Sequence, residues 1–258
     1  MILHSNILGQ GQAFIILHGF LGMSDNWKTL GRKFSEQGYE VHLVDQRNHG
    51  RSPHDAAFNY EVLIRDLEQY CDSYKISNIV LLGHSMGGKV SMLFAVKYPQ
   101  IVSKLIVADI SPRYYPVYHQ TILEGLSALN LDVLTSRKEA DEILANYVSE
   151  FDVRQFLLKN LYWVEKGKFA LRINLKVLKD NVEEIGEALP TNSIFKGDTL
   201  FLRGDKSDYI SINGEALINS HFPKATLNTI ENAGHWLHAE NPKDFFNHII
   251  KFIKKLLS

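Results

Sequence analysis

Short, mostly apolar runs recur along the first half of the chain, and their length suits β-strands that are covered on both faces. The stretches between them have the apolar spacing of helices. Strands that alternate with helices predict a mostly parallel, twisted sheet with helices on both faces. The predicted strands are residues 2–8 (an edge strand), 13–17, 40–44, 79–82, 104–108, 199–202 and 226–230, and the predicted helices include 27–37, 60–74 and a helix that ends at Tyr98, before Pro99.

This alternation stops between residues 113 and 195. The stretch is rich in aromatic residues and shows helical patterns, but no convincing parallel strand. Because the strand pattern resumes afterwards, we expect a helical lid inserted into an α/β core made of residues 1–112 and 196–258. A separate helical domain is the alternative. The helical patterns lie near residues 116–129, 137–149, 152–160 and 174–187.

The last helix has clear signals at both ends. Asn241 is placed as its N-cap, with Pro242 in the first turn and Asp244 near the positive end of the helix dipole. Three lysines, Lys251, Lys254 and Lys255, sit at the other end, where cations are favoured. The apolar stripe that we expect to pack on the sheet consists of Phe245, Ile249, Phe252, Ile253 and Leu256.

Composition narrows the function classes. The 258 residues carry a formal net charge of −1, so nothing indicates nucleic acid as a partner. No apolar run approaches the ~20 residues of a membrane span, and residues 1–6 lack the pattern of a signal peptide. The single cysteine, Cys71, rules out an intrachain disulfide and is expected to be buried. We therefore expect a cytoplasmic enzyme that is a monomer or a homodimer.

The sequence Gly83-His84-Ser85-Met86-Gly87 follows an apolar strand and opens a helix. Gly-x-Ser-x-Gly in this context is the form of a nucleophile elbow, a tight turn that holds the serine hydroxyl above the sheet. The two glycines are needed because a Cβ there would clash with the neighbouring strand and helix. Ser85 is therefore the predicted nucleophile.

A serine hydroxyl needs a general base within hydrogen-bond reach. Of the eleven histidines, His235 follows the last predicted strand, which returns the chain to the sheet edge of the elbow. The order nucleophile, acid, histidine also fits this choice. His235, His238 and Glu240 could suggest a metal site, but no His-Glu-x-x-His pattern or third ligand set is present, so we expect neither a metal nor a cofactor.

The acid that orients His235 has three candidates. Asp109 stands at the carboxyl end of strand 104–108, whereas Asp205 and Asp208 follow strand 199–202. In the usual spacing after that later strand, the acid would fall on Ser207, so Asp208 is one residue late and Asp205 two residues early. Asp109 is favoured, with Asp208 as the main alternative.

Two backbone N–H groups are needed to stabilise the oxyanion. One is expected from Met86, which follows the nucleophile. The other is expected from the loop after strand 13–17, where Gly19 allows close backbone approach and Phe20 is our choice.

The motifs together resemble the α/β-hydrolase superfamily over nearly the whole chain and, more narrowly, the YbfF-type bacterial esterases. The resemblance rests on residues 18–22 with Asp25-Asn26, and on residues 45–53, 83–89, 109–112, 155–159 and 234–240. It implies that Asp109 is the acid, although this chain also has Asp205 and Asp208 in the later loop. It also implies a helical lid and hydrolysis of short-to-medium acyl esters or thioesters.

We therefore expect a serine carboxylic-ester hydrolase acting on a small-molecule substrate. Residues 18–22 followed by Trp27 also resemble the lyase of menaquinone biosynthesis, whose site should present several arginines; the lid has Arg113, Arg137, Arg154 and Arg172. A third possibility is a non-catalytic ligand-binding protein built on the same fold.

Overall fold

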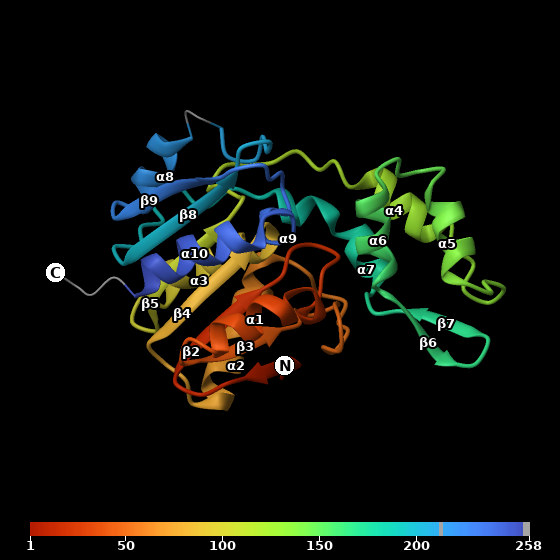
Figure 1. Ribbon diagram of the computed structural model, residues 1–258, viewed down its shortest axis with the longest axis horizontal. Coiled ribbons are helices and arrows are strands. Elements are labelled where there is room, and N and C mark those ends of the chain that lie inside the picture. The colour runs from red at the N-terminus through yellow and green to blue at the C-terminus, as the bar shows by residue number, and fades with distance from the viewer. Residues whose placement is uncertain (212–213, 255–258) are drawn as a thin grey trace.

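The computed structural model describes residues 1–211 and 214–254 (Figure 1). Its centre is a seven-stranded sheet with the order β1-β3-β2-β4-β5-β8-β9. Every neighbouring pair is parallel except β1 with β3, so the predicted mostly parallel sheet is confirmed. The strands are β1 (Ser5–Leu8), β2 (Gln12–Leu17), β3 (Tyr39–Val44), β4 (Ile79–His84), β5 (Val102–Ala108), β8 (Asp198–Gly204) and β9 (Ala225–Ile230).

The sheet separates two apolar cores. In β4, where every residue is buried, Leu81 belongs to one core while Val80 and Leu82 belong to the other. Because helices cover both faces, residues 79–82 of this strand are all apolar instead of alternating with polar residues. The first core includes α2 (Tyr60–Tyr74), α3 (Met86–Lys97) and α8 (Glu215–His221), and the second includes α1 (Lys28–Ser35) and α10 (Pro242–Ile253).

The N-terminus of α10 has a side-chain cap, whereas that of α1 has none. The Asn241 side chain accepts a hydrogen bond from the Asp244 N–H at 3.2 Å, as predicted. Asp25 and Asn26 do not cap α1, because a 3-10 turn, η1 (Ser24–Trp27), precedes it and the Asn26 side chain accepts from the Met23 N–H instead. Of the predicted apolar stripe, Phe245 and Ile249 are fully buried and Leu256 lies outside the described residues, as does Lys255 of the lysines at the helix end.

The segment expected to form the lid gathers beyond the carboxyl ends of the parallel strands (Figure 1). Its helices are shorter than predicted, and the helix expected over 174–187 breaks at Asn181 into an α-helix and a 3-10 turn. It also contains an antiparallel hairpin that the sequence patterns did not reveal, turning at Gly167 with a φ of 86°. The elements are α4 (Gln120–Ser127), α5 (Arg137–Leu144), α6 (Phe151–Leu158), β6 (Leu161–Glu165), β7 (Lys168–Leu171), α7 (Leu175–Asp180) and η2 (Val182–Gly186).

Length and hydropathy of the helices bear on membrane insertion. Within residues 1–211 and 214–254, no helix is long and apolar enough to cross a bilayer.

Candidate active site

Ser85 occupies a sharp turn between β4 and α3. Its φ of 53° and ψ of −120° lie outside the regions that non-glycine residues usually adopt. Close packing on both sides enforces this geometry: a Cβ on Gly87 would lie 2.5 Å from the His18 carbonyl oxygen, and one on Gly83 would overlap the Gly87 carbonyl. The Ser85 N–H donates to the Ala108 carbonyl of β5 at 3.0 Å. The turn therefore holds Ser85 at the carboxyl end of the sheet.

A chain of hydrogen bonds leads from this serine to a buried carboxylate. His235 Nε2 lies 3.0 Å from Ser85 Oγ, and His235 Nδ1 lies 2.8 Å from Asp109 Oδ2. With Nδ1–H donating to the carboxylate, Nε2 is free to accept the proton of the serine hydroxyl. The structure thus brings together Ser85, His235 and Asp109 from three separate segments of the chain.

Asp109 is fully buried and has three hydrogen-bond donors. Besides His235, the Gly204 N–H donates to Oδ1 at 3.1 Å, and the Ser207 hydroxyl donates to Oδ2. These donors give the buried carboxylate oxygens hydrogen-bond partners in place of water. The residue itself has a φ of 52°, in the left-handed region that non-glycine residues seldom adopt.

The two other carboxylates have different surroundings. Asp205 accepts a hydrogen bond from the Ala233 N–H at 2.9 Å, and backbone N–H donors of Asn232 and Ala233 lower its pKa. Asp205 therefore fastens the loop that precedes His235. Asp208 is exposed, and neither of the two has a hydrogen bond to His235 within the described residues.

An aromatic ring supports the imidazole from one side. Tyr209 stacks on His235 with ring centroids 3.8 Å apart and an interplanar angle of 16°. Tyr115 stacks in turn on Tyr209 at 5.4 Å, and its hydroxyl donates to the Tyr209 carbonyl at 2.6 Å. The Arg113 guanidinium lies over the Tyr115 ring, 3.9 Å from its centroid. No motif in the sequence pointed to this stack.

The backbone N–H groups expected to stabilise the oxyanion lie on either side of Ser85. A Cβ on Gly19 would lie 3.2 Å from Ser85 Cβ, so the loop after β2 passes directly over the serine. Leu21 has a φ of 60°, and the Gly22 N–H donates back to the Gly19 carbonyl at 3.0 Å, which makes the loop a tight turn. Neither the Phe20 N–H nor the Met86 N–H has an acceptor within the described residues.

Buried histidines hold these loops in place. His18 Nδ1–H donates to the Gly19 carbonyl at 2.8 Å, and His84 Nε2–H donates to the His235 carbonyl at 2.8 Å. His49 accepts from the Leu21 N–H at 3.2 Å. Burial lowers the pKa of all three, that of His49 to about 3. Neutral rings can both donate and accept, which suits this structural role. All three rings lie within motifs that the sequence analysis quoted, but a motif gives no sign of a ring's hydrogen-bond partners, so this structural role was not predicted.

The loop of residues 45–53 is organised by buried charge. Asp45 accepts hydrogen bonds from the Ser24 N–H at 2.6 Å and the Arg51 N–H at 2.9 Å. Arg47 binds the Asp66 carboxylate through two nitrogens, at 2.5 and 2.9 Å. This motif, which carried part of the family resemblance, therefore joins the site loops to α2.

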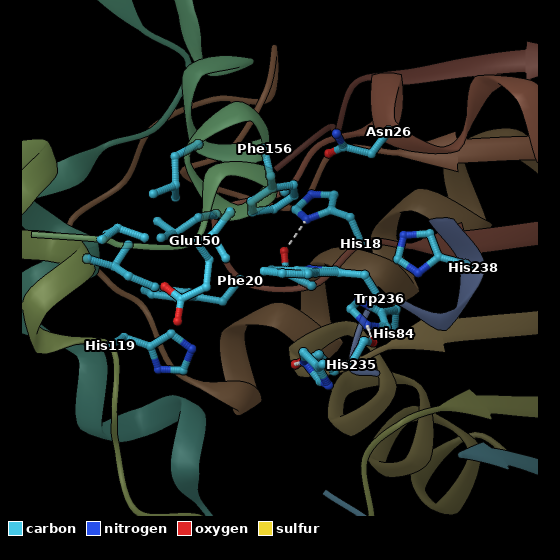
Figure 2. Close-up of a pocket in the computed structure, with 18 of the residues that line it drawn as sticks. His18, Phe20, Asn26, His84, His119, Glu150, Phe156, His235, Trp236 and His238 are labelled. Atoms are coloured by element: carbon cyan, nitrogen blue, oxygen red, sulfur yellow. Dashed lines mark hydrogen bonds between the residues drawn. The ribbon is translucent and has the colours of Figure 1, made fainter. Parts of the chain in front are cut away.

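Two cavities adjoin Ser85. The larger, about 520 Å³, has His235, Trp236 and His238 on one side and Phe156 and Glu150, from the segment expected to form the lid, on the other (Figure 2). The smaller, about 350 Å³, is lined by residues that include Met86, Ile110 and Ile185. Phe20, Ser85, His119 and Tyr209 line both cavities.

The residues considered for a metal site have other partners. His238 stacks on Trp27 of η1 with ring centroids 4.1 Å apart. Glu240, in the short helix α9 (Leu237–Glu240), accepts hydrogen bonds from the Gly234 N–H at 2.8 Å and the Trp236 N–H at 3.2 Å. In the part of the chain that the structure describes, no group of three or more histidine, cysteine, aspartate or glutamate side chains could hold a metal ion.

Comparison with known proteins agrees with this architecture. A family model described as alpha/beta hydrolase fold matches residues 12–152. The chain is 36% identical over 253 residues to the sn-1-specific diacylglycerol lipase ABHD11 of Danio rerio, covering 95% of this chain and 80% of that one. It is 32% identical over 242 residues to esterase YbfF of Escherichia coli, covering 93% and 92%.

Among solved structures, one titled marine microorganism esterase superposes with a TM-score of 0.94 at 37% identity, covering 98% of this chain and 99% of that one. Sequence and structure agree over nearly the full length of both proteins. The chain therefore belongs to the α/β-hydrolase family and, within it, to the YbfF-type esterases, which makes it a hydrolase of the carboxylesterase type.

Proposed function

We propose that this enzyme cleaves carboxylic esters by covalent catalysis, with Ser85 as nucleophile, His235 as base and Asp109 as the acid that orients the base. The observation that carries the proposal is the hydrogen-bond chain of Ser85 Oγ, His235 and Asp109, with links of 3.0 and 2.8 Å, beside two cavities. Each link joins atoms of the kind that acyl transfer by a serine requires.

The reaction then proceeds in two halves. Ser85 Oγ attacks the acyl carbon while His235 Nε2 takes the hydroxyl proton, and the Phe20 and Met86 N–H groups stabilise the oxyanion. Collapse breaks the bond to the alcohol oxygen, which receives the proton from His235. Water repeats the same steps on the acyl-enzyme, releasing the acid and restoring Ser85. Asp109 stabilises the imidazolium in both halves without taking its proton.

We infer a substrate that is an ester or thioester with a short-to-medium acyl group. The cavity volumes of about 520 and 350 Å³ support a ligand of moderate size. The names of the relatives, an esterase and a diacylglycerol lipase, also point to acyl esters.

The lyase alternative is weakened by the positions of the lid arginines. Arg137 donates to the Leu158 and Leu161 carbonyls, Arg154 binds Asp141, and Arg172 lies over the Tyr162 ring. Of the arginines among the described residues, only Arg113 lines either cavity. Its guanidinium lies over the Tyr115 ring. A substrate with several carboxylates would lack partners here.

The decisive experiment is hydrolysis of a chain-length series of p-nitrophenyl esters by the wild type and by Ser85→Ala. We expect turnover in the wild type and a loss of at least about 10³-fold in the variant, because the nucleophile is removed. Ser73→Ala, an exposed serine on α2, is the matched control and should keep wild-type rates. Equal rates for Ser85→Ala and the wild type would refute the mechanism. Absence of turnover on every ester would favour a ligand-binding role.

A further inference from the structure

The two cavities meet at Ser85 and are separated by aromatic side chains. Phe20 and His119 line both, and their rings pack edge to face with centroids 5.2 Å apart. Phe20 comes from the loop after β2, whereas His119 is the N-cap residue of α4. One residue of the core and one of the lid thus form the partition between the cavities. Ser85 is accessible from both sides of it.

The proposed base and one proposed oxyanion donor line different cavities. His235 lines only the larger cavity, whereas Met86 lines only the smaller one. In acyl transfer the base must reach the leaving oxygen to return the proton, so the alcohol has to lie on the histidine side of the serine. The acyl substituent of the tetrahedral carbon then points away from the histidine.

We propose that the smaller cavity holds the acyl chain of the ester and the larger cavity holds its alcohol. This assignment rests on the function proposed above and adds which residues select each half of the substrate. In the reaction the Ser85 Oγ–acyl bond forms with the chain in the smaller cavity, the bond to the alcohol oxygen breaks, and the proton carried by His235 leaves with the alcohol through the larger cavity.

The walls of the smaller cavity match an apolar acyl chain. Met86, Ile110, Pro116, Val117 and Ile185 contribute aliphatic surface, and its two charged lining residues, Arg113 and Asp208, are both exposed. A cavity of about 350 Å³ also limits the length of chain that can be enclosed.

The larger cavity is suited to an alcohol that carries further hydrogen-bonding groups. His238 is buried, and its Nδ1 has no hydrogen-bond partner within the described residues. Thr121 and Glu150 add polar atoms from the lid. A buried polar atom without a partner costs free energy, so a substrate group that pairs with it gains affinity. We therefore assign to this side a bulky alcohol with a hydroxyl or carbonyl beyond the ester.

Two lid valines offer a matched test. Val117 lines the smaller cavity and Val153 of α6 the larger one, and both are partly buried. Val117→Phe and Val153→Phe add the same volume on opposite sides of the partition. Each variant is assayed on p-nitrophenyl acetate, butyrate and octanoate, which vary the acyl chain, and on methyl, butyl and phenethyl butyrate, which vary the alcohol.

We expect Val117→Phe to lower the octanoate-to-acetate ratio of kcat/KM by about tenfold or more and to keep the wild-type ratios of the alcohol series. Val153→Phe should lower the phenethyl-to-methyl ratio in the same way and keep the acyl ratios. Because each ratio is formed within one preparation, a fraction of misfolded protein cancels.

The contrary outcomes are distinct. The reversed pattern, or equal effects of both variants on both series, would overturn the assignment while leaving ester hydrolysis intact. Wild-type protein that hydrolyses none of the six esters would overturn the proposed function, and the assignment with it.

Discussion

At the scale of single residues, the carboxylate beside His235 has a defined set of donors. Asp109 receives hydrogen bonds from His235, Gly204 and Ser207 while fully buried. An amide in its place would turn an NH₂ group toward one of these donors. That group would either face the Gly204 N–H or favour the imidazole tautomer that cannot accept the serine proton.

We therefore expect Asp109→Asn to lower kcat by about 10³- to 10⁴-fold. Asp208→Asn, at an exposed position that has no hydrogen bond to His235 within the described residues, should stay within about twofold of the wild type. Steady-state kinetics on one p-nitrophenyl ester, with circular dichroism as a control for folding, compares the two variants. The opposite ranking would transfer the role of the acid to the loop after β8.

At the scale of elements, one buried lysine joins α3, the helix after Ser85, to both ends of the segment expected to form the lid. Lys89 of α3 is fully buried, and its Nζ donates to the carbonyls of Arg113 and Glu187, each at 2.6 Å. Its own N–H donates to the Ser85 carbonyl at 3.1 Å, one turn from the nucleophile. Lys89 thus fastens the backbone at residues 113 and 187, near the two ends of the segment expected to form the lid, to the helix that begins directly after Ser85.

Burial lowers the pKa of Lys89 from 10.5 to about 7, with the nearby Arg113 charge acting in the same direction. Between these values the unfolded chain binds more protons than the folded protein, so the free energy of unfolding should rise with pH from about 7 to 10.5. We expect Lys89→Met to flatten this rise. Urea unfolding at pH 7.5 and 9.5 measures it, and an unchanged slope in the variant would contradict the prediction.

The elements also show which features a sequence can reveal. Buried parallel strands such as 79–82 were predictable because a run of apolar residues needs no partner to be recognised. The hairpin β6–β7 was not, since its strands are short and its stability includes the stacking of Trp163 on Phe169 at 3.7 Å. The helix α8 was also missed.

The residues of the candidate site also differ in how far the sequence reveals them. Ser85 and His235 carry local signals, a Gly-x-Ser-x-Gly turn and a histidine after the last strand. The choice among Asp109, Asp205 and Asp208 depends instead on how the loop after β8 packs against the end of β5, where the Gly204 N–H and the Ser207 hydroxyl meet Asp109. Such pairing between distant segments leaves no pattern in a single sequence.

At the scale of the whole molecule, core and lid segment share one apolar cluster. Leu105 of β5 and Leu126 and Leu144 of the lid helices belong to the same buried cluster, which continues through residues of α2 and α3. This continuity supports a lid inserted into the core over an independent helical domain, since a domain would have its own core.

Burial of several neutral histidines makes the free energy of unfolding depend on pH. Burial lowers the pKa of His49 and His238 to about 3 and that of His119 to about 4, from 6.5. Because the unfolded chain binds these protons first, stability should fall as pH drops below 6.5. At pH 5 each such group lowers the free energy of unfolding by about 2 kcal/mol. The whole free energy of unfolding of a protein is typically about 5–15 kcal/mol. We expect the urea midpoint of the wild type to decrease steeply from pH 6.5 to 5. The decrease should be smaller in His238→Gln, because unfolding of this variant takes up about one proton fewer. Equal slopes in both proteins would show that His238 is protonated in the folded state.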